Sequence, residues 1–278
     1  MQSMLRRLPN ARKICRTIGI SLLAGGLFAQ PAFSQSLEDI IAKGGCPDCD
    51  LRLRELRGLK LENADFSEAI LRETDLKEAE LANSNFREAD LRRTELERAI
   101  LSGSDFTEAS MRGVDMEKAD LARSRLKEAD LRNADLNETN LAGSDLSGAD
   151  LRQASLIRSD VSGALFRDAK MENVDFERSI MVGADFSNAR LKNADLDRAS
   201  AQGANFDGAD LSGVRLSSAN LTGASLRDTK LGDALLRHTK LAGADLTGAS
   251  GLSPDRIIGA CGDEKTKLPY GITLEPCT

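Results

Sequence analysis

The sequence lacks the residues from which catalytic centres are most often built. It contains no tryptophan, one tyrosine (Tyr270) and one histidine (His238) in 278 residues. A histidine that acts as a general base for a nucleophile needs that nucleophile and an orienting group close by, and the sequence pairs His238 with neither. A glycine-rich phosphate-binding loop is also missing. The sequence therefore predicts a non-enzymatic protein without a cofactor or a metal.

The balance of charges excludes another class of function. Charged residues make up 29% of the chain, a share that also suits disordered proteins, but the regular repeat described below argues against disorder. The chain has 38 basic and 44 acidic residues, and removal of the first 34 residues leaves 33 basic ones and a net charge of −11. Contacts to nucleic-acid phosphates need an excess of lysine and arginine. We therefore expect no general nucleic-acid binding.

The first 34 residues have the pattern of a secretory signal. A basic start between Arg6 and Arg16 is followed by an apolar core from Ile18 to Ala29, and Ala32 and Ser34 occupy the −3 and −1 positions of a cleavage site. The apolar core is too short for a stable membrane span. We predict cleavage after Ser34 and export to the periplasm, with a thylakoid lumen or the cell surface as alternatives. An uncleaved anchor is the other interpretation of this segment.

A repeat of five residues dominates the rest of the chain. From Leu61 to Leu246 every fifth residue, 38 positions in all, is Leu, Phe, Met or Val, with Ala201 as the exception. The residue two places before each of these centres is small, and Asp or Asn often stands between the two. A period of five fits neither a helix nor a strand, so the chain must turn at every unit. Ala201 predicts a locally underpacked place.

The phenylalanines indicate how many units complete one coil. All seven that follow the signal segment stand at repeat centres, and six of them differ by multiples of 20. These six are Phe66, Phe86, Phe106, Phe166, Phe186 and Phe206, and Phe176 is the seventh. A coil of twenty residues contains four units, so we predict a square cross-section with phenylalanines stacked along one inner wall.

This pattern resembles the pentapeptide-repeat family over about residues 50–250. The resemblance implies an all-β fold, a right-handed quadrilateral β-helix, here with about 9–10 coils and short helical caps. We divide the chain into a signal peptide (1–34), an N-terminal cap with a C-x-x-C sequence (35–50), the repeat β-helix (51–250) and a C-terminal helix and tail (251–278).

A solenoid needs caps because its end coils expose strand edges and core. Ser36 to Gly44 predicts a short helix, with Ser36 as the N-cap and Gly44 as the stop. Ser253-Pro254 predicts the start of a second helix that runs through Ile258. An irregular tail follows at residues 262–269 and resembles the tails of other exported family members of Gram-negative cells.

Four cysteines remain after the signal segment: Cys46, Cys49, Cys261 and Cys277. Nine to ten coils at the strand spacing of about 4.7–4.9 Å separate the two sets by about 45 Å. A disulfide needs Cα atoms within about 7 Å, so any pairs are local, Cys46–Cys49 and Cys261–Cys277. We predict structural disulfides, which export makes plausible. A redox C-x-x-C and a half zinc site are the alternatives.

Stacking by twenty residues turns the sequence into columns on the outer surface. One column is basic: Arg72, Arg92, Arg112, Arg132 and Arg152. An acidic column runs beside it: Asp75, Glu95, Asp115 and Asp135, continued by Asp175 and Asp195. Like charges about 5 Å apart repel, so we expect the two columns to form a lattice of salt bridges across one corner. The alternative interpretation is a docking strip for a charged partner.

A third column consists of glycines, Gly143 to Gly243 in steps of twenty, and predicts type II turns at that corner. Its surroundings are smooth and nearly uncharged. We hypothesise that this is a contact face for a partner protein or for a second copy of the chain. The candidate residues are Ala142, Gly143, Ser162, Gly163, Ile180, Val182, Gly183, Gln202 and Gly203. The alternative is that these residues have only a structural role, in forming the turns of this corner.

These features predict an exported scaffold or protein-interaction module with an unknown protein partner. The resemblance implies an alternative, because some family members that confer quinolone resistance mimic DNA and bind gyrase. The predicted export and the lack of a loop interrupting the repeat argue against that function. An enzyme or redox carrier built on the cysteines is the third hypothesis.

Overall fold

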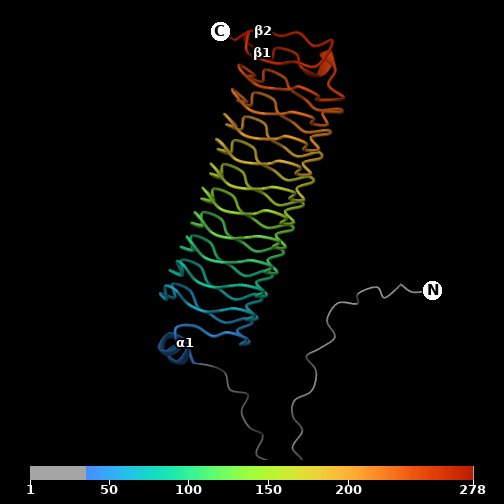
Figure 1. The fold of residues 1–278 in the computed structure, drawn as a ribbon. Helices are drawn as coiled ribbons and strands as arrows, with labels where there is room; N and C mark the ends of the chain where they lie inside the picture. The colour runs from blue at the N-terminus through green and yellow to red at the C-terminus, as the bar shows by residue number, and fades with distance from the viewer. Residues whose placement is uncertain (1–35, 278) are drawn as a thin grey trace, which may run out of the picture. The chain divides into compact units, whose positions relative to one another are not determined.

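Backbone pairing repeats every twenty residues along the part of the chain that the computed structural model describes, residues 36–277. Parallel β-bridges join one residue of each five-residue unit to the residue twenty positions later in the sequence. The first of these bridges joins Gly45 to Asp65, and the last joins Lys230 to Ser250. Figure 1 shows the resulting stack of coils, which runs from blue to red without a break. The predicted signal peptide lies outside the described residues, so its prediction is untested.

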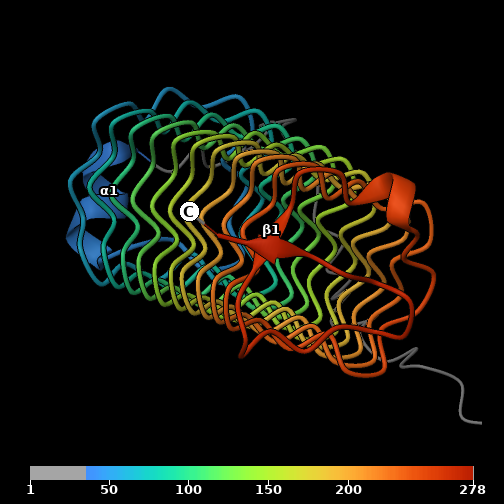
Figure 2. The same cartoon turned by 90° about the horizontal axis from the view of Figure 1, so that it is seen from above.

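Each five-residue unit contributes one short bridging segment and one turn. In the unit that begins at Leu71, the carbonyl of Leu71 accepts a hydrogen bond from the Thr74 amide at 3.2 Å, and Asp75 then pairs with Glu95 of the next coil. The step of twenty between paired residues therefore contains four turns. Viewed from above in Figure 2, the successive coils lie over one another in register.

The interior consists of the repeat centres and the small residues. Phe86 stacks on Phe106 with ring centroids 4.8 Å apart, and Phe166 stacks on Phe186 at the same distance. Phe176 meets Phe166 edge-on at 6.0 Å, so it stands on a different wall. The predicted phenylalanine column is thus confirmed. Each buried Leu or Phe side chain contributes roughly 1.5–3 kcal/mol. Ala201 is fully buried in its column, and its looser packing stays a prediction.

Most buried hydroxyl groups at the small positions donate to backbone carbonyls, either of the preceding coil or, as at Ser144 and Ser159, of their own unit. The Thr74 hydroxyl donates to the carbonyl of Leu51 at 2.8 Å, and the Thr94 hydroxyl donates to that of Leu71 at 2.7 Å. A buried hydroxyl without a partner is costly, so these bonds let threonine and serine replace alanine inside the rod.

The corners share one backbone conformation. In the turn of nearly every unit the second residue has a positive φ, 56° at Glu73 and 65° at Gly183. This is position i+2 of a type II turn, where glycine is favoured but other residues are accepted at a cost. The glycines were predicted to be what permits the turn, but Glu, Asn, Arg and Asp adopt it at other corners. None of the non-glycine residues with positive φ in residues 36–277 is β-branched.

The N-terminal end is capped by helix α1, Leu37–Lys43. The Ser36 hydroxyl accepts a hydrogen bond from the Asp39 amide, the Asp39 carboxylate accepts one from the Ser36 amide, and Gly44 ends the helix with φ 68°. Ile40 of this helix is fully buried against the first coil. The predicted helix, with its predicted start and stop, is confirmed.

The C-terminal end differs from the prediction. The expected helix through Ile258 is only a 3₁₀ turn, η1, Pro254–Arg256. It stops early because the carbonyls of Arg256 and Ile258 accept hydrogen bonds from the preceding coil, from Leu236 and His238. These carbonyls are therefore engaged by the stack, and the side chain of Ile257 is buried.

The predicted irregular tail instead continues the stack. Lys240 pairs with Cys261 and Asp245 pairs with Lys267, so the step grows from twenty residues to 21 and then 22. Strand β1, Cys261–Gly262, then pairs in parallel with β2, Glu275–Pro276. The tail covers the end of the last coil, near the label C in Figure 1.

Among residues 36–277 no helix has the length and apolar character needed to span a bilayer. The one α-helix there, α1, has seven residues.

Candidate interaction surfaces

The predicted contact face lies along one corner, which we call the uncharged corner. It comprises the two turn residues of six successive coils: 142 and 143, 162 and 163, 182 and 183, 202 and 203, 222 and 223, and 242 and 243. None of these twelve residues is charged. The Gly163 amide donates to the carbonyl of Val182 at 2.9 Å, and the Gly183 amide donates to that of Gln202 at 3.0 Å. The structure therefore joins the turns of this corner into one continuous column.

Two branched apolar side chains stand out from this corner. Val182 is 43% exposed and Ile180, on the adjoining wall of the same coil, is 45% exposed. A Cβ atom added at Gly163, Gly183 or Gly203 would have no atom within 4 Å, so the surface around them is open. All nine residues predicted for the contact face thus lie on four successive coils.

The five arginines of the basic column do not pair with the acidic column, and the predicted lattice between the two is wrong. Arg92, Arg132 and Arg152 each hold the aspartate two residues earlier on the same coil. In each pair Nε donates to Oδ1 at 2.7 or 2.8 Å and Nη2 donates to Oδ2 at 2.6 Å. Arg72 reaches Asp90 of the next coil, with Nε 3.2 Å from Oδ2.

The reason is the direction of the first turn residue. The side chain of this residue points back along its own wall and not across the corner. It reaches the bridging residue two places earlier on the same coil or eighteen places later on the next coil. The acidic column follows the same rule with other partners, because Asp75 pairs with Arg57 and Glu95 with Lys77. Sequence reasoning missed the aspartates that serve the arginine column, Asp90, Asp130 and Asp150. The recurring spacing Asp-Leu-Arg was the signal that could have found them.

Hydrogen bonds and charge shift the pKa values along these columns in opposite directions. The bidentate bond from Arg132 lowers the pKa of the Asp130 carboxyl despite its partial burial, and the same contact raises the pKa of Arg132. In the acidic column, burial and then the nearby charges of Glu97 and Asp135 raise the pKa of Asp115. Folding therefore favours the charged forms of Asp130 and Arg132 and disfavours the charged form of Asp115.

Both predicted disulfides are present. Cys46 and Cys49 are joined with Cα atoms 5.6 Å apart, and Cys261 and Cys277 with Cα atoms 4.8 Å apart. Cys46 and Cys49 are buried and occupy a centre position and a small position, so the C-x-x-C is itself the first repeat unit. The stack therefore begins before residue 51. A reactive redox pair is normally exposed, so this placement favours a structural disulfide.

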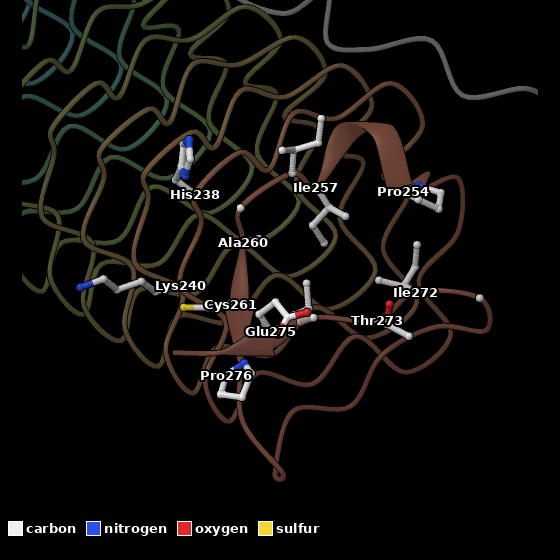
Figure 3. A pocket seen from close by; sticks show the side chains of 14 residues that line it. His238, Lys240, Pro254, Ile257, Ala260, Cys261, Ile272, Thr273, Glu275 and Pro276 are labelled. Carbon is white, nitrogen blue, oxygen red and sulfur yellow. The ribbon is translucent and has the colours of Figure 1, made fainter. Parts of the chain in front are cut away.

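A hollow at the C-terminal end is shown in Figure 3. Side chains from η1, from β1, and from β2 and the segment before it surround the hollow, and Ile257, Ile272 and Pro276 give it an apolar character. His238 contributes from the preceding coil, where a Cβ atom on Gly259 would come within 2.5 Å of its Nδ1. The His238 ring therefore lies over Gly259 as part of the cap. Among residues 36–277 no cluster of three or more His, Cys, Asp or Glu is placed to hold a metal ion.

Comparison with known sequences identifies the repeat. The sequence pattern described as pentapeptide repeats matches the chain in eight copies, within residues 55–217 and 219–250. The chain therefore belongs to the pentapeptide-repeat family. No match is found among curated protein sequences.

Several solved structures are similar to the chain. HetL, a pentapeptide repeat protein involved in regulating heterocyst differentiation in the cyanobacterium Nostoc sp. strain PCC 7120, is 32% identical, with 75% of this chain and 87% of HetL covered and a TM-score of 0.41. QnrB1, a plasmid-mediated fluoroquinolone resistance protein, is 20% identical over 77% of this chain and 94% of its own, with a TM-score of 0.32. A pentapeptide repeat protein of the Arabidopsis thaliana thylakoid lumen is 35% identical over 41% of this chain and 72% of its own, with a TM-score of 0.21.

Proposed function

We propose that this pentapeptide-repeat protein is an exported, non-enzymatic scaffold that binds a protein partner through the uncharged corner. In this proposal the rod is a right-handed, four-sided β-helix that holds the corner rigid. The observation that carries the proposal is a column of six uncharged turns on one corner, from residues 142 and 143 to residues 242 and 243. In the whole chain, 29% of all residues are charged. Depletion of charge is what distinguishes the centre of a protein interface from the rest of a surface.

The other corners support this interpretation by contrast. At the corner that includes Lys118, Arg158 and Arg198, charged residues recur on successive coils and several form ion pairs. A solvated corner therefore tolerates charge in this fold, and the geometry of the turn does not require its absence. Val182 and Ile180 supply apolar area for a partner at the middle of the uncharged corner.

The proposed location is the periplasm. Two lines support it: the signal-like pattern of residues 1–34, and the two disulfides, which form and persist in oxidising compartments. Localisation of a tagged full-length protein, with mass measurement of its mature N-terminus, tests the proposal. A product that keeps residues 1–34 and stays in the cytoplasm contradicts it.

The contact face is tested by adding charge to it. Ala142→Glu and Val182→Glu place a carboxylate at the first turn position of two coils, where the backbone conformation is ordinary. A matched control is Ile157→Glu, which changes the same turn position on another corner. We expect loss of a crosslinked partner from envelope extract, or loss of a dimer by light scattering, with the first two variants and not with the control. Unchanged mass and unchanged crosslinks in all three variants remove the contact face from the proposal.

A further inference from the structure

The pairing of aspartate with arginine along the basic column is interrupted at two coils, those of Arg72 and Arg112. Four coils carry Asp-Leu-Arg, and in each the guanidinium donates two hydrogen bonds to the carboxylate two residues earlier. The four pairs are Asp50 with Arg52, Asp90 with Arg92, Asp130 with Arg132 and Asp150 with Arg152. At the coil of Arg112 the residue in the aspartate position is Ser110.

Arg112 finds no replacement carboxylate. It is exposed and forms no ion pair with any residue of the described range 36–277. Arg72, whose own coil has Ile70 in the aspartate position, reaches forward to Asp90. The equivalent partner for Arg112 is Asp130, whose two oxygens accept hydrogen bonds from Arg132. The charge of Arg112 helps to lower the pKa of Asp130, but the two groups form no ion pair.

The same coil is hollowed. A surface hollow of about 640 Å³ is lined there by the short side chain of Ser110, by Gly113 and by guanidinium groups from successive coils. The guanidinium groups on its wall belong to Arg72, Arg92, Arg93, Arg112 and Arg132, and the carboxylates of Glu73 and Asp130 line it as well. Arg93 is held by Glu73 at 3.4 Å, whereas Arg112 stands between Arg92 and Arg132 with coils only about 4.7–4.9 Å apart. Asp90 neutralises Arg92 and Asp130 neutralises Arg132, whereas Arg112 lies between them without an ion pair of its own in residues 36–277.

We propose that Ser110 and Arg112 mark a binding site for a tetrahedral oxoanion, a phosphate group. The planar guanidinium of Arg112 offers two parallel N–H donors, the geometry that recognises phosphate, and the Ser110 hydroxyl offers a third donor. Arg92 and Arg132 on the neighbouring coils already hold Asp90 and Asp130, so the proposed site depends on Arg112 and Ser110. The phosphate is either free inorganic phosphate or the phosphate of a lipid headgroup.

This site is separate from the proposed contact face. Arg112 and the turn residue Ala142 of the uncharged corner are thirty residues apart, which is one and a half coils. A partner on the uncharged corner and an anion at Arg112 therefore use different walls. Failure of one proposal leaves the other standing.

The test is titration of the mature full-length chain at low ionic strength, because salt screens exposed charges. Inorganic phosphate is followed by calorimetry in one arm, and co-sedimentation with phosphatidylglycerol vesicles against phosphatidylcholine vesicles forms the other. We expect Arg112→Gln to weaken binding at least tenfold. Arg52→Gln, in the same column but outside the hollow, is the control and leaves binding unchanged.

Ser110→Asp separates binding from folding. It restores Asp-Leu-Arg to this coil, so Arg112 gains the intramolecular partner that its neighbours have. We expect binding to fall at least tenfold while the melting temperature stays equal or rises. Binding of the parent protein in either arm, lost in both Arg112→Gln and Ser110→Asp, supports the site and shows which source of phosphate it takes. Absence of binding in both arms, or binding that both variants retain, overturns the proposal.

Discussion

Phe86 lies over Phe106 with its ring centroid 4.8 Å away and the two ring planes only 2° from parallel. The distance matches the spacing between stacked strands, about 4.7–4.9 Å, so the backbone step and the ring step are the same. Each ring in the column therefore supports the coil above and the coil below. A repeat solenoid gains its stability from such contacts, because each repeat packs against its neighbours.

Replacement of Phe86 by alanine should destabilise the protein strongly. The side chain is fully buried and touches Phe66 on one side and Phe106 on the other, so Phe86→Ala leaves a cavity between two rings. We expect a loss of about 3–5 kcal/mol in the free energy of unfolding, measured by urea denaturation. Phe86→Leu is the matched control, because leucine fills the same column at Leu126 and Leu146. A smaller loss for alanine than for leucine would contradict the stacked column.

Replacement of Asp115 by asparagine should stabilise the protein at neutral pH. Burial and the neighbouring charges of Glu97 and Asp135 raise the pKa of Asp115, so its ionised form opposes folding above that pKa. Asparagine keeps the turn, because Asn85 at the same kind of position accepts a hydrogen bond from the Arg87 amide. We expect a gain of up to about 1 kcal/mol at pH 7 in urea denaturation.

The pH dependence gives the sign of this effect. The gain from Asp115→Asn shrinks as the pH falls through the raised pKa, and it vanishes below about 3.9, where the aspartate is protonated in both states. Asp90→Asn should behave in the opposite way. The hydrogen bonds from Arg92 lower the pKa of Asp90, so its contribution is present above about pH 3.9 and is lost as the pH falls towards the lowered value. Equal curves for the two variants would contradict the separate environments of the two columns.

Removal of the C-terminal disulfide should loosen the cap more than the rod. The Cys261–Cys277 bond encloses the tail, whose strands β1 and β2 pair over only two residues each. A loop of about this length is worth about 3 kcal/mol in the chain-entropy description. We expect Cys261→Ser with Cys277→Ser to speed hydrogen exchange at the backbone amides of Lys267 and position 277, while the amide of Phe186 keeps its protection. Unchanged exchange at the tail would show that hydrogen bonds alone hold it.

The interior of the rod could be predicted from the sequence because burial leaves a strict pattern. Phe66, Phe86 and Phe106 are spaced by twenty because one coil has twenty residues. Each ring packs on the residue at the same place of the next coil. The two disulfides followed from the same step, because coils set the distance between cysteines. The N-terminal helix followed from Ser36 and Gly44, whose roles at helix ends are local.

The outer surface was less predictable because exposed side chains choose between several partners. Arg92 has an acid three residues later, Glu95, and another two residues earlier, Asp90, and only the direction of the turn decides for Asp90. The prediction of a helix at the C-terminal end of the stack was wrong for a different reason. Pro254 looked like the start of a helix, but the carbonyl of Arg256 is used by the preceding coil, and that long-range bond leaves no local trace in the sequence.

The turn at Gly183 provides a test of how the corners are built. Its φ of 65° is shared by asparagine at Asn173 and Asn193, with φ of 59° and 58°, and a Cβ atom on Gly183 would meet nothing within 4 Å. Gly183→Asn should therefore cost well under 1 kcal/mol, since asparagine tolerates the left-handed region. Gly183→Val should cost about 1–2 kcal/mol more than that, because a β-branched side chain crowds its own backbone at positive φ. Urea denaturation of both variants measures the difference, and equal stability would mean that the corner relaxes to another turn.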